Sequence, residues 1–250
     1  MKKFAFTVLL SASNAFGFKL GVTAGPHAMI AEEVVKIAKK DGLTIEVVEF
    51  NDFILPNIAL NQGDLDANSY QHQPFLDNQI KDRGFKLASV AKTVLMPLGV
   101  YSKKVKNLAE IKEGTTIGIP NDPTNGGRAL LLLEKVGLIT LKNKDLPGIF
   151  DIADNPKKLD IKELDAPQLP RSLDDLDLAV INTDWVILGK LDPHSALISE
   201  ATDSPYTNVI ATRIGEQDNE DVKKLVKAYQ SSEVKNFIQA KFAGAIIPAW

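Results

Sequence analysis

Strand-like and helix-like segments alternate along almost the whole chain, and this alternation restricts the fold more than any other feature. Residues 19–23 and 43–50 have the pattern of short buried strands. Between them, apolar residues recur with helical spacing at Ile30, Val34, Ile37 and Ala38. Repeated alternation of strand and helix predicts parallel sheets that are covered by helices.

A second series of the same kind begins near residue 103. Strands are expected at 115–120, 159–164, 176–182 and 206–213, and helices at 127–136 and 183–191. No flexible Gly/Ser linker separates the two series, and the chain crosses between them in extended segments near 95–105 and 204–212. We therefore predict two α/β lobes, each a mostly parallel sheet flanked by helices, joined by two crossover strands. The cleft between such lobes is the expected ligand site.

The predicted division places residues 16–102 and 205–250 in lobe 1 and residues 103–204 in lobe 2. Residues 1–15 are predicted to be a secretory signal peptide, because Lys2 and Lys3 precede an apolar run and Ser13 and Ala15 fit a small-x-small cleavage site. The chain has no cysteine, so neither a disulfide nor a lipid-anchoring cysteine is available. We expect an exported protein that is free in the periplasm.

The composition favours a soluble globular protein and argues against several other classes. With 44% hydrophobic and 24% charged residues and a net charge of −3, the chain has no basic excess that would indicate nucleic-acid binding. No apolar run reaches the roughly 18 residues that a membrane-spanning helix needs.

The loop at 121–128, Asn-Asp-Pro-Thr-Asn-Gly-Gly-Arg, is the strongest candidate for an anion site. It lacks the Lys-Ser/Thr pair of a phosphate loop and the G-x-G-x-x-G spacing of a dinucleotide loop. Free backbone N–H groups at a helix start and the planar fork of Arg128 suit a carboxylate or a phosphate. A solvated arginine after a simple turn explains the same residues equally well. If Arg128 lies in the cleft rather than in a core, its replacement by alanine should cost little stability.

Other loops at predicted strand ends contribute polar and aromatic side chains. Tyr70 and His72 follow a short strand, and one alternating pair should face the cleft, unless both are only packed. Asn182 follows the strand at 176–182 and could be a simple helix N-cap. Asn208 lies within a predicted strand, where asparagine is unfavourable.

Signatures of an enzyme are missing from the sequence. There is no G-x-S-x-G nucleophile motif and no cysteine nucleophile, and the histidines His27, His72 and His194 lack metal-ligand spacing. We expect no catalysis, no metal and no cofactor.

Several segments together resemble a known family. DANSYQHQPFLD, IPNDPTNGGRALLLLEKVGLI, LDAPQLPRSLDDLDLAVINTDW, SPYTNVIATR and the final tryptophan are similar to the methionine-binding lipoproteins of ABC importers, the NlpA/MetQ type. The resemblance covers residues 18–250. It implies a type II periplasmic binding protein that delivers L-methionine, or in some members a methionine-containing dipeptide, to a permease driven by an ATPase subunit.

The resemblance also implies which residues bind the ligand. The family's histidine and the aromatic residue before its Gln-His step correspond to His72 and Tyr70, and an aromatic of a preceding segment corresponds to Phe53. The remaining implied binding residues are Asn125, Arg128, Asn182 and Asn208. Two departures are the absent cysteine and the replacement of a usual aromatic by Ser69, which bears on side-chain specificity.

On this basis we expect a monomeric, extracytoplasmic binding protein for L-methionine. Arg128 would hold the carboxylate together with nearby N–H groups, Asn182 and Asn208 would accept from the ammonium group, and the aromatics would surround the thioether. Another small amino acid or a dipeptide is the alternative within this class. An enzyme or a non-transporting adhesive surface protein on the same fold are the alternatives outside it.

Overall fold

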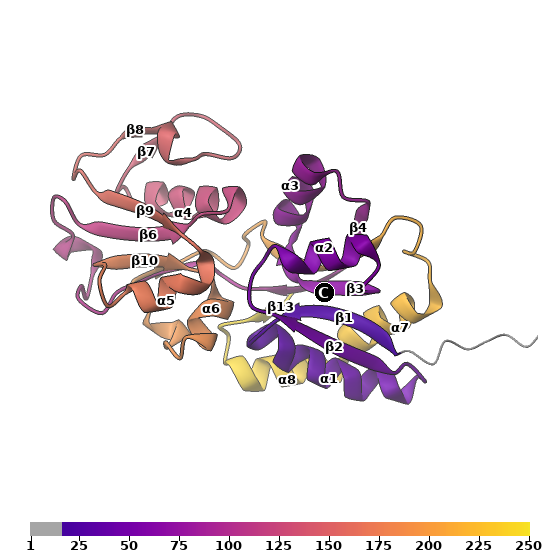
Figure 1. Cartoon of the computed structure of the whole chain (residues 1–250). Helices are drawn as coiled ribbons and strands as arrows, with labels where there is room; N and C mark the ends of the chain where they lie inside the picture. The colour runs from indigo at the N-terminus through magenta and orange to yellow at the C-terminus, as the bar shows by residue number, and fades with distance from the viewer. Residues whose placement is uncertain (1–16) are drawn as a thin grey trace, which may run out of the picture.

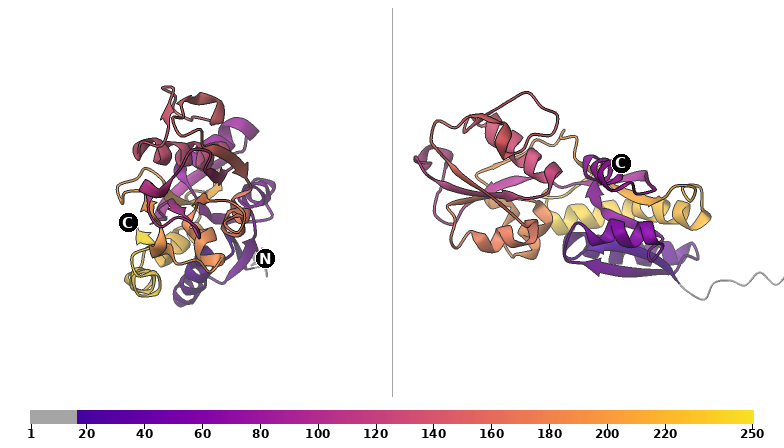
Figure 2. Two further views of the ribbon diagram at one scale, coloured as in Figure 1. Left: turned by 90° about the vertical axis from the view of Figure 1, so that its left-hand side faces the viewer. Right: turned by 45° about the horizontal axis from the view of Figure 1, so that its top comes forward.

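The structure of the protein is a computed structural model that describes residues 17–250. The predicted signal peptide lies outside the described residues. The chain forms two α/β lobes side by side, as Figure 1 and the right-hand view of Figure 2 show. The predicted two-lobed fold is confirmed.

The first lobe is built on a six-stranded sheet with a parallel centre. Its strands β2, β1 and β3 pair in parallel, and β12, β4 and β13 extend it with antiparallel pairings. In spatial order the strands are β13 (Ile247–Pro248), β4 (Leu87–Leu95), β12 (Thr207–Arg213), β3 (Ala67–His72), β1 (Phe18–Thr23) and β2 (Ile45–Phe50). The sheet is therefore mixed rather than mostly parallel, because β12 returns from the second lobe and enters against the direction of β3.

The second lobe has a five-stranded sheet and a small hairpin. Strands β10, β6 and β9 are parallel, whereas β5 and β11 are antiparallel additions at one edge. In spatial order the strands are β11 (Ile198–Ser199), β5 (Gly99–Tyr101), β10 (Leu178–Ile181), β6 (Thr116–Pro120) and β9 (Asp160–Leu164), and the hairpin is β7 (Thr140–Leu141) with β8 (Ile152–Asp154).

Helices cover both faces of both sheets. In the first lobe α1 packs with α7 and α8 on one face, while α2 and α3 lie on the other. The helices of this lobe are α1 (Pro26–Lys40), α2 (Leu55–Gln62), α3 (Gln73–Arg83), α7 (Glu220–Tyr229) and α8 (Ser232–Phe242). Those of the second lobe are α4 (Pro123–Lys135), α5 (Leu169–Ser172) and α6 (Thr183–Leu188).

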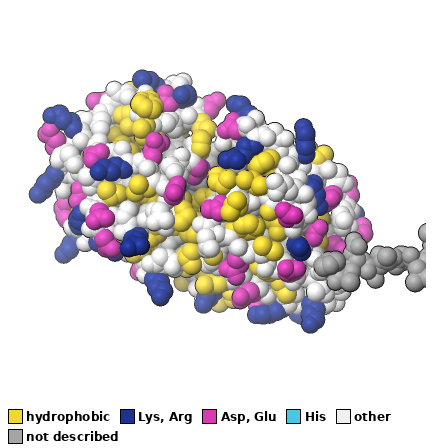
Figure 3. Space-filling view, viewed as in Figure 1, with side chains coloured by type: hydrophobic (Ala, Val, Ile, Leu, Met, Phe, Trp, Pro, Cys, Tyr) yellow, Lys and Arg dark blue, Asp and Glu magenta, His cyan; other side chains and the backbone are white. Residues whose placement is uncertain are grey.

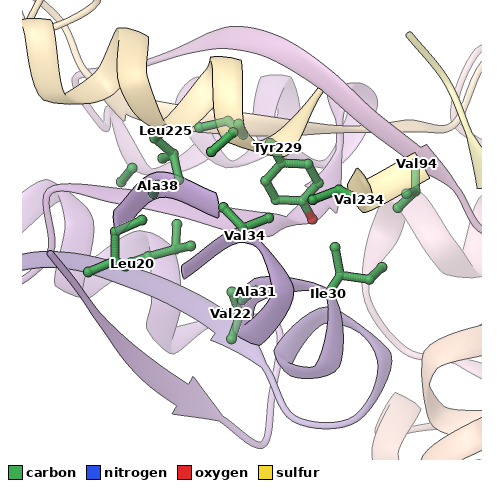
Figure 4. Packing of buried hydrophobic residues seen from close by; sticks show 14 of the residues in the cluster. Leu20, Val22, Ile30, Ala31, Val34, Ala38, Val94, Leu225, Tyr229 and Val234 are labelled. Carbon is green, nitrogen blue, oxygen red and sulfur yellow. The ribbon is translucent and has the colours of Figure 1, made fainter. Parts of the chain in front are cut away.

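The core of the first lobe shows why the helical spacing of the sequence produces this layer. Ile30, Val34 and Ala38 are fully buried along one side of α1, where they meet residues of the sheet and of α7 and α8 (Figure 4). Tyr229 lies at the centre of this cluster, and its hydroxyl accepts a hydrogen bond from Ser69 Oγ at 3.2 Å. The tyrosine thereby fixes β3, which carries two of the predicted site residues.

The chain crosses between the sheets twice, at residues 96–98 and at residues 200–206. Strand β5 was expected in lobe 1, but it pairs with β10 and β11 in the second sheet. Pro97 lies between β4 and β5, and since proline cannot donate a backbone hydrogen bond, it ends the expected continuous strand at 87–102. The predicted limits of the lobes otherwise remain a prediction.

Candidate functional site

A cavity lies between the two lobes, at the carboxyl ends of β2, β3, β6 and β10, where a ligand of such sheets is expected. The first lobe contributes residues from α1, β3, α3, β12 and the segments after β2 and β4. The second lobe contributes residues from α4 and from the turn between β10 and α6. The cavity is lined by His27, Phe53, Tyr70, Gln71, His72, Phe75, Met96, Asn125, Arg128, Asn182, Asp184 and Asn208.

All seven residues expected to bind the ligand therefore line one cavity, although they come from both lobes. Tyr70 and His72 belong to β3 itself rather than to a loop after it, and Gln71 between them also lines the cavity. Tyr70 and His72, one alternating pair, both line the cavity, while the side-chain amide of Gln71 is hydrogen-bonded to Asn57 and Asn68. Whether these seven side chains touch a ligand stays a prediction.

Asp122 fixes the orientation of the polar side chains in the second lobe. Its carboxylate caps α4 by accepting from Asn125 N at 2.9 Å, and it also accepts from Asn125 Nδ2 at 3.0 Å. The Asn125 amide oxygen must then point the other way, where it accepts from Asn182 Nδ2 at 2.9 Å and lies 3.1 Å from His72 Nε2. His72 Nδ1 accepts from Phe75 N at 3.1 Å, so Nε2 carries the proton and donates to Asn125.

This network leaves one buried acceptor without a partner. Asn182 uses its amide nitrogen for Asn125, and its Oδ1 is buried with no hydrogen-bond partner within residues 17–250. An unpaired buried acceptor costs roughly 1–3 kcal/mol. Asn182 therefore offers a position for a donor group of a ligand, and it does not cap α6 with its side chain.

The two cavity histidines are neutral at physiological pH. Burial lowers the pKa of His27 to about 3. Burial, and secondarily the charge of Arg128, lowers the pKa of His72 to about 3 as well. Neutral His27 accepts at Nε2 from Asn208 Nδ2 across 3.3 Å, which leaves the amide oxygen of Asn208 for another partner.

Arg128 is buried and contacts Glu200, Met96 and Tyr206. Its Nε donates to Glu200 Oε1 at 2.7 Å and its Nη2 donates to Glu200 Oε2, while Nη2 also donates to the Met96 carbonyl at 2.9 Å. The guanidinium lies 4.3 Å from the centre of the Tyr206 ring. Within the described part of the chain Nη1 has no hydrogen-bond partner. Arg128 lines the cavity, so this nitrogen is the donor that remains for an anion.

The two glycines of the loop serve packing rather than anion binding. Helix α4 begins at Pro123, four residues earlier than the sequence suggested, and the N–H groups of Asn125 and Gly126 are already bonded to Asp122. A Cβ at Gly126 would come within 2.7 Å of the Pro120 carbonyl, and one at Gly127 would meet a carbonyl at 2.9 Å. Gly126 lets the helix start approach β6 closely, and Gly127 lets it approach the segment at Pro147. The N–H groups of Asn125 and Gly126 are not available to a carboxylate.

Aromatic side chains form the apolar wall of the cavity. The Phe53 ring lies 6.3 Å from Tyr70, 6.1 Å from Phe75 and 5.3 Å from Trp185. The Tyr70 hydroxyl donates to the Phe53 carbonyl at 2.9 Å and so ties the loop after β2 to β3. Such a wall, together with the thioether of Met96, suits an apolar or sulfur-containing side chain.

Sequence reasoning missed five residues that line the cavity. For His27 and Met96 no local signal exists, because each is brought to the cavity by the packing of its own lobe. Phe75 has a local signal in its position three residues after His72, which caps α3. The other two are Gln71 and Asp184, and burial raises the pKa of the Asp184 carboxyl group to about 7.

Other functional classes find little support in the part of the chain that the structure describes. Between residues 17 and 250, no group of three His, Cys, Asp or Glu side chains could hold a metal ion. No helix in that range is long and apolar enough to cross a membrane. On the face shown in Figure 3, basic and acidic side chains are interspersed without a continuous basic area, so this face does not have the charge pattern of a nucleic-acid site.

Comparison with known proteins places these features in a family. The profile of the NlpA lipoprotein family matches residues 18–250. The chain is 52% identical to the D-methionine-binding lipoprotein MetQ of Salmonella typhi, covering 93% of this chain and 88% of that protein. It is 47% identical to outer membrane lipoprotein 3 of Mannheimia haemolytica, covering 98% and 95%.

A solved structure shares the whole fold. A nutrient-binding protein from Burkholderia cenocepacia, bound to methionine, superposes with a TM-score of 0.92 at 50% identity, covering 93% of this chain and all of that one. The resemblance seen in the sequence motifs is thus confirmed across both lobes. By its sequence and its fold, the chain belongs to the NlpA lipoprotein family.

Proposed function

We propose that this protein captures L-methionine in the interlobe cavity and delivers it to an ABC importer. One observation carries the proposal. Within residues 17–250 the donor Arg128 Nη1 and the buried acceptor Asn182 Oδ1 have no hydrogen-bond partner, and both residues line the same aromatic cavity. A free amino acid carries the complementary pair, a carboxylate and an ammonium group. The names of similar proteins, which include D-methionine-binding lipoproteins and a structure bound to methionine, support the choice of side chain.

The free energies expected from these contacts agree with reversible binding of the ligand. A micromolar dissociation constant corresponds to about 8 kcal/mol. Burying a methionine side chain against Phe53, Tyr70 and Phe75 contributes roughly 1.5–3 kcal/mol, and each charge-assisted hydrogen bond contributes roughly 1.5–3 kcal/mol. Neither the aromatic wall nor Arg128 reaches the required sum alone, so both ends of the ligand must be held.

We further propose that the cavity binds without catalysis. The two histidines that line it are neutral, both nitrogens of His72 and Nε2 of His27 are hydrogen-bonded, and Arg128 has a fixed carboxylate partner, so these polar groups are arranged to hold a ligand. The proposed partners are a membrane permease and its ATPase subunit, and the proposed location is outside the cytoplasm, as a monomer. We also propose that the protein is not lipid-anchored, which metabolic labelling with a radioactive fatty acid tests.

Ligand analysis tests the function directly. The purified protein is denatured and the released small molecules are identified by mass spectrometry, and stripped protein is then titrated calorimetrically with L-methionine, D-methionine and glycyl-methionine. We expect recovery of methionine and tightest binding of the L enantiomer. Recovery of a compound that is not an amino acid, with no heat or thermal shift on adding either enantiomer or the dipeptide, would refute the proposal.

A further inference from the structure

A carboxyl group that has no cationic partner among the described residues lines the cavity. Asp184 is the second residue of α6 and is only 3% exposed. Its Oδ1 accepts from Trp185 N at 2.9 Å, and its own backbone N–H also donates to the carboxyl group. Among the described residues no Lys, Arg or His forms an ion pair with it. Buried carboxylates are normally paired, because the loss of water around an isolated charge is costly.

The surroundings of Asp184 do not supply the missing cation. Helix α4 contributes Arg128, whose positive charge acts to lower the pKa of Asp184, but its hydrogen-bonded carboxylate partner is Glu200 and not Asp184. Helix α1, which packs against α6, contributes His27, and β3 contributes His72, and both rings are neutral. The charged or titratable groups of the other elements packed on α6 are exposed at the surface, namely Arg171 of α5 and Asp192 and His194 at η4 (Pro193–Ser195).

Hydrogen-bond acceptors and donors therefore lie on different sides of the cavity. The start of α6 presents acceptors, because Asn182, which precedes the helix, carries the Oδ1 atom and Asp184 in its first turn carries the carboxyl group. Helix α4 presents the donor, Arg128. An α-amino acid has the matching order of charges, whereas an acid that lacks the amino group would leave the acceptors unpaired.

We propose that the Asp184 carboxylate is the counter-ion of the ligand's α-ammonium group, so that capture of the amino acid releases a proton from Asp184 and tightens as the pH rises through neutrality. This inference rests on the proposed function, since it requires a free amino acid in the cavity. Asp184 would thereby select α-amino acids over their deaminated analogues. The O–H bond of the carboxyl group breaks, its proton goes to solvent, and the carboxylate accepts a hydrogen bond from the ammonium.

The size of the pH effect follows from the free protein. Burial raises the pKa of Asp184 to about 7, so the group is largely protonated at pH 6 and largely ionised at pH 8. An ammonium group beside it lowers that pKa in the complex. Linkage then makes the dissociation constant roughly tenfold larger at pH 6 than at pH 8. His27 and His72, with pKa values of about 3, do not titrate in this range.

Calorimetry on the stripped, mature protein tests the inference. L-methionine is titrated between pH 5.5 and 8.0 in pairs of buffers that differ in ionisation enthalpy, and we expect release of close to one proton per ligand at pH 6. The Asp184→Asn variant keeps an oxygen for Trp185 N, and it should bind at least tenfold more weakly at pH 8 with no pH dependence. Asp192→Asn, on the surface, is the matched control and should behave as the wild type.

The outcomes separate this inference from the proposed function. Methionine binding of equal strength at pH 6 and pH 8, without proton release, overturns the role of Asp184 and leaves methionine capture intact. Failure of methionine to bind at every pH overturns both. If Asp184→Asn does not fold, as judged by its thermal transition, the proton release of the wild type decides the matter, and 4-(methylsulfanyl)butanoate, which lacks the amino group, should then bind weakly and without releasing a proton.

Discussion

Replacing Arg128 by alanine should weaken both the fold and the binding of ligand. The sequence suggested little loss of stability, but the side chain is only 3% exposed and its partner Glu200 is 10% exposed. Removing one partner of a buried pair costs about 3–5 kcal/mol, because it leaves the other charge without compensation. Glu200 keeps its hydrogen bond from Leu98 N at 2.9 Å, so we expect the lower end, about 3 kcal/mol.

Two measurements test the Arg128→Ala variant. Urea unfolding, monitored by tryptophan fluorescence, should show the loss in the free energy of unfolding, and the melting temperature should fall by about 6–12 °C. Calorimetric titration of the folded variant with L-methionine should show a loss of roughly 10- to 150-fold in affinity, the value of a charge-assisted hydrogen bond to the carboxylate.

Glu200→Gln is the matched control, because it removes the ion pair while Arg128 keeps its bond to the Met96 carbonyl and its contact with Tyr206. It should lower stability but leave the affinity for methionine within about threefold, and the double variant should cost less than the sum of the single changes. Two results would contradict this account of Arg128. One is a free energy of unfolding of Arg128→Ala within about 0.5 kcal/mol of the wild type, which is the usual error of additivity. The other is an unchanged affinity for methionine.

Three further changes test other parts of the site. Asn182→Ala removes the unpaired acceptor and should weaken methionine binding at least fivefold, about 1 kcal/mol, with little change in melting temperature, as calorimetry and a thermal scan can show. Gly126→Ala would place its Cβ 2.7 Å from the last carbonyl of β6 and should cost more than about 1 kcal/mol in urea unfolding, whereas Gly148→Ala has free space and should be nearly neutral; equal costs would argue against the packing role. The folded-state pKa values of His27 and His72, about 3, lie below the unfolded value of 6.5, so the stability they confer is full above pH 6.5 and is lost as the pH falls toward 3. His27→Asn should therefore reduce the slope of unfolding free energy against pH by about 1.4 kcal/mol per unit between pH 4 and 6, and an unchanged slope would show that this ring is not buried as a neutral group.

The sequence predicted which residues come together at one cavity better than it predicted the details of the fold. The predicted parallel strands end at one edge of each sheet, so residues that follow them, such as Phe53 and Asn182, were expected to converge, and they do line one cavity. The start of α4 was placed too late, although Asp122 and Pro123 form a recognisable N-cap and first helical residue. The antiparallel entry of β12 was not visible, because strand direction depends on how the chain returns from the second lobe.

What the sequence by itself determined was the alternation of strands and helices, the two lobes, the family and the residue types at strand ends, because these depend on local periodicity and on motifs. Only the tertiary structure decided the partners and the charge states. Arg128 meets Glu200, which lies 72 residues away in the sequence, and this pair gives the cavity arginine a structural role as well. Asp184 and His27 acquire their shifted pKa values from burial, which is a property of the tertiary packing and has no signature in the local sequence.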